Sequence, residues 1–259
     1  MNLKAVARYC YANIPGAAAV RFAAKDLTAS YFMKQEFMGV KRLAIRSGLI
    51  VDIGANRGQS TAAFRTLAPD CQIAAFEPEP HSAHRLAFRY RRDATVTVHE
   101  CALGSCPGSI KLYLPKYGRW DCDGMAATDF ATATEWLKNP GRMYRFDHTK
   151  LTVREHEVSC VTLDSYSLAP VLIKLHAQGA ELDILKGSQQ TLKQTRPALM
   201  CAFPSPALTA FVAEFGYQPH VYSNEHFRPG IAPPHVTFTW YLTDAMTGVR
   251  SGGAEGRMP

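Results

Sequence analysis

The segment from Val51 to Gly58 most constrains the fold. In it a short apolar run is followed by a glycine-containing turn and then by the start of a predicted helix. Residues 49–53 are apolar apart from Asp52, as in a strand buried on both faces of a parallel sheet. Gly54 and Gly58 carry no Cβ, so the backbone can approach a ligand closely. The helix start offers unpaired N–H groups to an anionic group. The segment predicts a ligand-binding strand–turn–helix unit.

Strand-like and helix-like segments alternate along the rest of the chain. We expect strands at 49–53, 72–76, 94–101, 158–163, 171–175, 198–203 and 235–242, and helices at 59–68, 80–92, 181–194 and 207–215. Residues 109–114 alternate in character and suggest an added antiparallel hairpin. This order predicts an α/β fold with a doubly wound, mainly parallel sheet, helices on both faces and an antiparallel last strand.

Three further segments lie outside that alternation. Residues 1–48 are expected to form an N-terminal helical arm, because they show no compact apolar run followed by a signal-peptide cleavage site. Residues from about 115 to 157 are polar and glycine-containing, and we expect an insertion with a short helix at 132–138 but no sustained strand. The glycine-rich residues 248–259 are expected to form a flexible tail. No stretch is long and apolar enough to span a bilayer.

Charge and cysteine content narrow the class of protein. The net charge of +7 comes from dispersed basic residues, which disfavours a nucleic-acid surface but leaves room for an acidic or membrane-surface acceptor. The seven cysteines contain no CxxC pair, so we expect free thiols in a reducing compartment, the cytoplasm. His148 and His156 lack a third ligand at suitable spacing, and we expect no metal site.

The glycine spacing argues against a dinucleotide-binding fold. Counted from Gly54, the G-x-G-x-x-G fingerprint requires glycine at the positions of Asn56 and Gln59. Glu77 ends the second expected strand, 19 positions after Gly58, and its carboxylate can accept hydrogen bonds from two ribose hydroxyls. We therefore disfavour nicotinamide or flavin binding and expect Glu77 to bind a ribose.

Five segments, in this order, resemble the FkbM family of class I methyltransferases. They are VDIGANRG at 51–58, AFEP at 75–78, ALG at 102–104, VTLD at 161–164 and IKLHAQGAE at 173–181. The similarity covers roughly residues 49–203. It implies a Rossmann-like, seven-stranded class I methyltransferase domain over 49–247 and S-adenosylmethionine as methyl donor. It also implies O-methylation of a hydroxyl on a sugar, glycolipid or other small molecule.

The resemblance also assigns residues of the cofactor site. It implies that the methionine portion is held by Asp52, Gly54, Asn56 and Gly58, and that Glu77 and Pro78 lie at the ribose. Glu100 and Ala102 are expected beside the adenine, although the family often has Asn where this chain has Glu100. Asp164 is expected to be structural, capping the turn that follows it.

The fourth strand departs from the family pattern. The family has Lys-x-Asp-x-Glu/Gln-Gly-x-Glu here, and this chain keeps Lys174, Gln178 and Glu181 but has His176 in place of Asp. One hypothesis makes His176 the general base that accepts the hydroxyl proton, since a neutral imidazole can do so. The other takes His176 as a mark of lost catalysis in a non-catalytic cofactor-binding or scaffolding relative. Lys174 is a second candidate catalytic residue, although its ammonium is expected to point inward and to be paired.

The acceptor is expected to be a small molecule, a sugar or a lipid-linked compound. Polar and aromatic candidates for its site lie in the insertion: Tyr113, Tyr117, Trp120, Asp121, Asp123, Trp136 and Tyr144. The same side chains can instead pin the insertion onto the core, and that interpretation is favoured. Nucleic-acid methylation is disfavoured, because no target-base motif such as Asn-Pro-Pro-Tyr follows the fourth strand.

Overall fold

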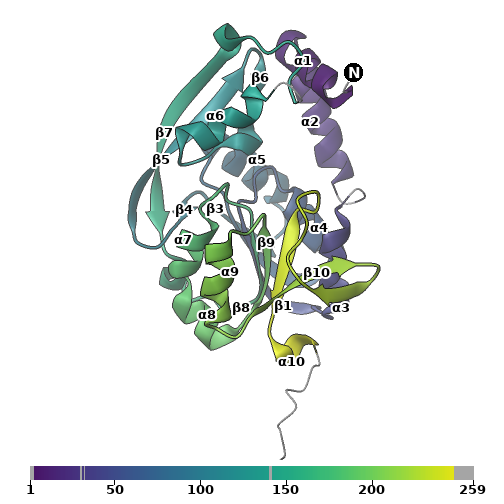
Figure 1. Cartoon of the computed structure of the whole chain (residues 1–259), viewed down its shortest axis with the longest axis vertical. Coiled ribbons are helices and arrows are strands. Elements are labelled where there is room, and N and C mark those ends of the chain that lie inside the picture. The colour runs from purple at the N-terminus through teal and green to yellow at the C-terminus, as the bar shows by residue number, and fades with distance from the viewer. Residues whose placement is uncertain (1–2, 30, 32, 140–141, 248–259) are drawn as a thin grey trace, which may run out of the picture.

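An eight-stranded sheet forms the centre of the molecule in the computed structural model, which describes residues 3–29, 31, 33–139 and 142–247 (Figure 1). The strand order is β11-β10-β12-β9-β8-β1-β2-β3. The strands are β1 (Ser47–Ile53), β2 (Asp70–Phe76), β3 (Val96–His99), β8 (Pro170–Leu175), β9 (Ala198–Ala202), β10 (Gln218–Ser223), β11 (His226–Pro229) and β12 (Phe238–Leu242). The expected tail at 248–259 lies outside the described residues.

The sheet is mainly parallel, as predicted. β1 pairs in parallel with both β2 and β8, and β9 continues the parallel set. β12 runs antiparallel to β9 and β10, which confirms the antiparallel last strand. The hairpin β10–β11 adds two strands that the sequence did not predict. The strand expected at 158–163 instead lies in a separate sheet, as the end of β7 (Leu151–Val161), so the main sheet has eight strands and not seven.

Helices cover both faces of this sheet. One face packs on α7 (Glu181–Lys186), α8 (Gln189–Thr195) and α9 (Pro206–Ala213), through a core that includes Ile173 and Leu185. The other face packs on η1 (Gln35–Met38), α3 (Gly39–Arg42) and α4 (Gln59–Leu67), around Phe64 and Trp240. α5 (Pro80–Tyr90) buries Leu86 beside Ala75 of β2. The doubly wound architecture is therefore confirmed.

The helix expected at 181–194 is divided into α7 and α8 at Gly187 and Ser188. A Cβ at Gly187 would lie 2.0 Å from the carbonyl oxygen of Gly104, so the chain passes too close there for any larger residue. Asp164 accepts hydrogen bonds from the N–H groups of Gln190 and Thr191. Asp164 is structural, as expected, but it caps α8 and not the turn beside it.

The antiparallel addition expected at 109–114 is confirmed as part of β5 (Gly108–Tyr117), but the expectation of no sustained strand in the insertion is wrong, because β7 begins at Leu151. β5 pairs antiparallel with β7 along its whole length. The short strands β4 (Ala102–Leu103) and β6 (Trp120–Asp121) complete a four-stranded sheet. Most of β7 is exposed, so its charged sequence gives no apolar alternation. Between the strands lie η2 (Asp123–Met125), α6 (Phe130–Lys138) and η3 (His148–Lys150).

Of the arm expected at 1–48, the first two helices pack against this insertion, whereas residues 35–42 pack on the main sheet and β1 begins at Ser47. These two helices are α1 (Leu3–Asn13) and α2 (Ala17–Thr28), drawn in purple beside β6 and α6 in Figure 1. Ala12 and Phe22 share an apolar cluster with Tyr117, Trp120 and Leu137. Short helices η4 (Leu163–Tyr166) and α10 (Asp244–Thr247) complete the described elements. Within the described residues, no helix is long and apolar enough to cross a bilayer.

Candidate active site

A cavity opens at the carboxyl ends of β1, β2 and β8, the edge at which ligands bind in open α/β sheets. Gly54, Glu77 and His176 line it from those three strand ends, and Ala102 and Leu103 line it from β4. Residues of the insertion cover it: Ile110 and Leu112 of β5, and Gly124, Ala126, Ala127 and Thr128. The cavity is thus enclosed jointly by the main sheet and by the insertion.

The turn after β1 brings two parts of the backbone together. Gly54 has a φ of +67°, and a Cβ there would lie 2.0 Å from the carbonyl oxygen of His176. Gly58, with a φ of +83°, precedes α4, and a Cβ there would lie 2.5 Å from Leu86. Both positions require glycine because of conformation and space together. The ends of β1 and β8 therefore meet with no side chain between them.

Asn56 carries an unpartnered polar atom beside the cavity. Its backbone has a φ of +48°, and its N–H donates to Oε2 of Glu77 at 2.7 Å. Its side-chain oxygen Oδ1 is buried and accepts no hydrogen bond from the described residues. A buried acceptor without a donor costs stability, and a bound hydrogen-bond donor would remove that cost.

Glu77 lies in the cavity lining almost fully buried, with Pro78 next to it. Oε1 accepts the N–H of Glu79 at 2.9 Å. Burial raises the pKa of Glu77 to about 7, although the two backbone donors, of Glu79 and Asn56, favour the carboxylate. Each oxygen has accepted one bond and can accept another, so the carboxylate is placed to bind two hydroxyls.

The two residues expected at the adenine separate in the structure. Ala102 lines the cavity, close to Cys101 and Leu103. Glu100 points elsewhere: its exposed carboxylate pairs with Nε2 of His84 at 3.0 Å, outside the cavity lining. Glu100 is thus an exposed acid at the end of its strand and does not line the cavity.

Asp52 and Lys174 form a buried ion pair beneath the cavity. Their Oδ1 and Nζ atoms are 2.9 Å apart, and both side chains are almost completely buried. The Asp52 carboxylate also accepts from the hydroxyls of Ser60 and Thr61. The Lys174 ammonium also donates to the carbonyl oxygens of Ile53 and Gly54. The inward, paired Lys174 agrees with expectation, and neither side chain lines the cavity.

His176 is the one candidate catalytic residue that lines the cavity. The backbone N–H of His176 donates to the carbonyl oxygen of Ile53, which fixes the end of β8. Burial, and then the nearby ammonium groups of Lys174 and Lys34, lower the pKa of His176 to about 3. The imidazole is therefore neutral at physiological pH and can accept a hydrogen bond from a hydroxyl.

The loop after His176 is fixed by a residue whose role the sequence did not reveal. Glu181 accepts the N–H groups of Ala177 at 2.7 Å and of Gly179 at 3.0 Å. Gln178 has a φ of +52° and donates to the carbonyl oxygen of Gly124 in the insertion. A first-turn acid favours any helix start, so only the structure identifies Glu181 as the residue that holds this loop.

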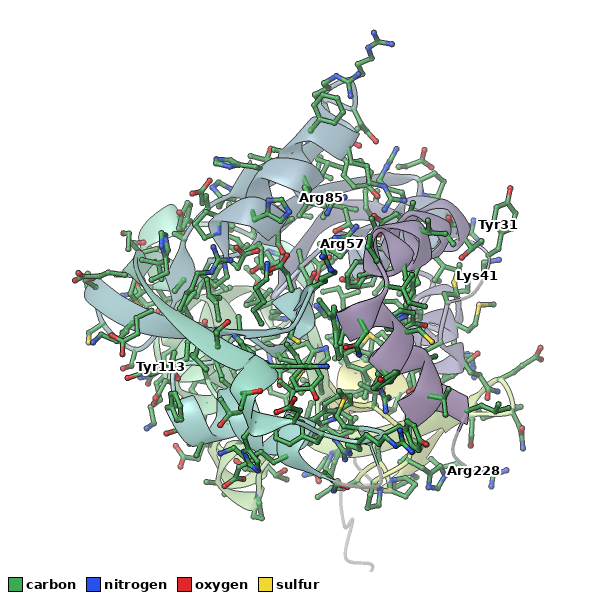
Figure 2. The ribbon with its side chains drawn as sticks, turned by 90° about the horizontal axis from the view of Figure 1, so that it is seen from above. Tyr31, Lys41, Arg57, Arg85, Tyr113 and Arg228 are labelled. Atoms are coloured by element: carbon green, nitrogen blue, oxygen red, sulfur yellow. The ribbon has the colours of Figure 1, made fainter. Side chains whose placement is uncertain are left out.

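The aromatic residues of the insertion mostly pack it in place. Tyr117 and Trp120 are buried in the cluster shared with the arm. Trp136 lies 4.5 Å from the guanidinium of Arg8, and the ring of Tyr144 packs edge-on against Tyr9. Tyr113 packs against Phe130 and is labelled in Figure 2, well away from Arg57 and the arm.

The acidic candidates of the insertion do not point to an acceptor site either. Asp121 pairs with Lys116 at 3.1 Å, and no side chain is described for Asp123. Among the described residues, no group of three His, Cys, Asp or Glu side chains could hold a metal ion.

Comparison with known proteins places the chain in a family. The model of the methyltransferase FkbM domain matches residues 52–222, well over half of the chain. The 2-O-methyltransferase NoeI of Sinorhizobium fredii is 27% identical over 155 residues, which are 57% of this chain and 60% of NoeI. The chain therefore matches less than two thirds of that relative.

Solved structures of methyltransferases show weaker similarity. Methyltransferase FkbM from Methylobacillus flagellatus is 15% identical with a TM-score of 0.48, covering 88% of this chain and 60% of that one. An S-adenosylmethionine-dependent O-methyltransferase from Thermotoga maritima is 10% identical with a TM-score of 0.36, covering 81% and 64%. The family model, which spans the turn at Gly54, Glu77 and the end of β8, decides the assignment: this chain belongs to the FkbM methyltransferase family.

Proposed function

We propose that this protein is an O-methyltransferase that uses S-adenosylmethionine to methylate a hydroxyl on a sugar, glycolipid or other small molecule. The family supports methyl transfer, and the similarity to NoeI, a 2-O-methyltransferase, supports oxygen as the acceptor atom. The observation that carries the proposal is that the Glu77 carboxylate and the unpartnered side-chain oxygen of Asn56 belong to the same cavity.

The residues of this cavity fit S-adenosylmethionine. The Glu77 carboxylate has acceptor capacity for the two ribose hydroxyls, and the Asn56 oxygen needs a donor such as the methionine ammonium. Phe76, Leu103 and Ile110 give the cavity an apolar wall that suits a flat adenine ring. In this proposal Gly54, Gly58 and Pro78 shape the backbone around the ligand, while Asp52 and Lys174 position the turn from below.

Bound there, S-adenosylmethionine supplies a methyl group on a positively charged sulfur. As the new C–O bond forms and the S–C bond breaks, the hydroxyl must lose its proton. His176 is the neutral acceptor in the lining, and we assign to a ring nitrogen the hydrogen bond that orients the hydroxyl.

The low pKa of His176, about 3, determines at which stage of methyl transfer the imidazole can accept the hydroxyl proton. An imidazole this weak does not deprotonate an alcohol in advance. An oxygen that has gained the methyl group is a far stronger acid than an imidazolium, so His176 can take the proton as the bond forms. The products are a methyl ether, S-adenosylhomocysteine and one released proton.

A second candidate function is non-catalytic cofactor binding, favoured by the same residue. Two ammonium groups near His176 oppose a positive charge on the imidazole. An aspartate at that position would instead be stabilised by Lys174 and Lys34. The two candidates therefore predict opposite responses to substitution at this position.

The test measures cofactor binding and methyl transfer separately. Calorimetry with S-adenosylmethionine and S-adenosylhomocysteine comes first, and tritiated methyl transfer to cell-extract fractions of sugars and lipids follows. If the protein is an O-methyltransferase, His176→Ala reduces turnover about 10²-fold or more while S-adenosylhomocysteine affinity persists. His84→Ala, which changes an exposed histidine outside the cavity, is the matched control.

Two results decide against a catalytic role of His176. Unchanged turnover in His176→Ala removes the histidine from the mechanism. Binding without transfer by the wild-type protein, together with transfer by His176→Asp, establishes the non-catalytic candidate. If neither S-adenosylmethionine nor its product binds, the proposed function itself is wrong.

A further inference from the structure

A second group of side chains meets His176 outside the lining of the cofactor cavity. We name Lys34, Phe203, Thr237 and Phe238 the outer cluster; none of them lines that cavity. The ring centroid of His176 lies 6.2 Å from that of Phe203 and 5.9 Å from that of Phe238, both edge-on. His176 therefore borders both the cofactor cavity and the outer cluster.

Phe203 is held in a costly conformation at the carboxyl end of β9. Its φ is +44°, in the left-handed region that a bulky residue rarely occupies, and 60% of its surface is exposed. Its N–H donates to the carbonyl oxygen of Thr237 at 3.0 Å, which fixes that backbone in place. A strained, exposed aromatic residue beside a reactive group points to binding, because burial gives it no compensation.

Lys34 supplies a positive charge next to these rings. Its Nζ donates to the hydroxyl of Thr237 and lies 5.6 Å from the Phe238 ring centroid. Across the described part of the chain, Lys34 forms no salt bridge, and an ammonium has three protons to donate. Burial, opposed by Glu36, lowers the pKa of Lys34, so the charge is partly desolvated and an anionic partner would stabilise it.

The segment that carries Lys34 is anchored to the sheet. The buried Glu36 accepts the N–H of Thr237 at 3.0 Å, and its carbonyl oxygen accepts Nε1 of Trp240 at 3.1 Å. The ammonium is thus tied to the start of β12, next to the end of β9. Its position relative to His176 does not depend on a free loop.

We propose that the outer cluster binds the acceptor, and that the acceptor is a sugar carrying an anionic group, with the ring against Phe203 and the anion on Lys34. Aromatic faces suit the C–H surface of a sugar, and an ammonium bonds carboxylate or phosphate more strongly than it bonds a neutral hydroxyl. A hydroxyl of such a sugar would then face His176. This inference rests on the proposed function, whose acceptor it specifies.

The anion could also be the methionine carboxylate of the cofactor, and the experiment separates the two. S-adenosylhomocysteine affinity is first measured for the wild type, Lys34→Met, Lys34→Arg and Phe203→Ala. Methyl β-glucuronide, glucose 6-phosphate and neutral methyl β-glucoside are then titrated into each protein saturated with S-adenosylhomocysteine. The two charged sugars distinguish carboxylate from phosphate.

The wild type is expected to bind one charged sugar about tenfold or more tightly than the neutral glucoside. Lys34→Met removes that preference, Lys34→Arg retains most of it because the charge persists, and Phe203→Ala weakens all three sugars alike. None of these variants changes S-adenosylhomocysteine affinity.

Three results overturn the inference. They are a preference that survives in Lys34→Met, a loss of S-adenosylhomocysteine affinity in that variant, and no binding of either charged sugar to the saturated wild type. Failure of the wild type to bind S-adenosylhomocysteine at all contradicts the proposed function instead, so the two failures are distinguishable.

Discussion

At the scale of single residues, ionisation of Glu77 is linked to folding and, in the function that we propose, to cofactor binding. Its pKa of about 7 exceeds the ordinary value of 4.5 because the carboxyl is buried. Between those two values the folded protein holds a proton that the unfolded chain releases. The contribution of Glu77 to stability is therefore present below about pH 4.5 and falls as the pH rises to about 7.

Binding of S-adenosylhomocysteine is expected to release protons through Glu77. Ribose hydroxyls donate to the carboxylate and favour the ionised form, which lowers its pKa. At pH 7 the free protein carries this proton in roughly half of the molecules, so binding releases up to about half a proton. Calorimetry in phosphate and in Tris buffers at pH 7 measures the release from the difference in apparent enthalpy.

Glu77→Gln should abolish that release and weaken binding by about tenfold or more, because a charged acceptor is lost. Glu214→Gln, at an exposed position, is the control and should behave as the wild type. A release that persists in Glu77→Gln would assign the proton to another group.

At the scale of elements, the N-terminal arm is fastened to the turn that we assign to the cofactor. Nη2 of Arg57, in that turn, lies 2.7 Å from the carboxylate of Asp26 in α2, and its guanidinium lies 4.4 Å from the ring centroid of Phe22. Figure 2 shows Arg57 next to the purple arm helices. Arg89 of α5 also donates to the backbone of Asp26. The conformation of the turn therefore depends on α2 as well as on the sheet.

Asp26→Asn should destabilise the protein by about 1–3 kcal/mol, less than a fully buried pair, since Asp26 is partly exposed. For a chain of this size the melting temperature falls by roughly 2–10 °C. Because the turn is displaced, S-adenosylhomocysteine should also bind more weakly, although Asp26 lies outside the cavity lining.

Thermal denaturation and calorimetry measure both effects of this substitution. Asp183→Asn, which removes an exposed pair with Lys186, serves as the control and should change neither quantity appreciably. Unaltered ligand affinity in Asp26→Asn would show that the turn holds its conformation without the arm.

The strand-end turns could be predicted from sequence because their signals are local. Gly54, Gly58 and Glu77 lie within or next to strands whose apolar runs are continuous. The β7 strand could not be predicted, because it is largely exposed and its charges hide the period. The placement of Lys34 beside His176 depends on packing between segments far apart in the chain. The strain at Phe203 likewise has no sequence signature.

At the scale of the whole molecule, the insertion forms one wall of the cavity that we assign to the cofactor. Gly124 and residues 126–128 contribute to the lining, and the Gln178 side chain donates a hydrogen bond to the carbonyl oxygen of Gly124. The insertion is in turn packed on the arm through the cluster around Trp120. We therefore expect a ligand in the cavity to contact both sheets of the protein.

Hydrogen exchange should report this closure. S-adenosylhomocysteine is expected to slow exchange several-fold in residues 122–128 as well as in the turn at 54–58, because both lose local opening when the ligand is bound. The β10–β11 hairpin, remote from the lining, is the internal control. Protection confined to 54–58 would mean that the insertion does not contact the ligand.

The Lys174 ammonium has a consequence for how this protein can acquire new substrates. By holding the carbonyl oxygens of Ile53 and Gly54 while paired with Asp52, it joins the end of β1 to the strand that leads to His176. Because these contacts join the end of β1 to the end of β8, a substitution that moves one strand end should also move the other. We expect substrate range to change more freely at Lys34 and Phe203, which bond Thr237 and make no hydrogen bond to Asp52 or Lys174 among the described residues. A laboratory search for altered acceptors should therefore randomise Lys34 and Phe203 and keep Lys174.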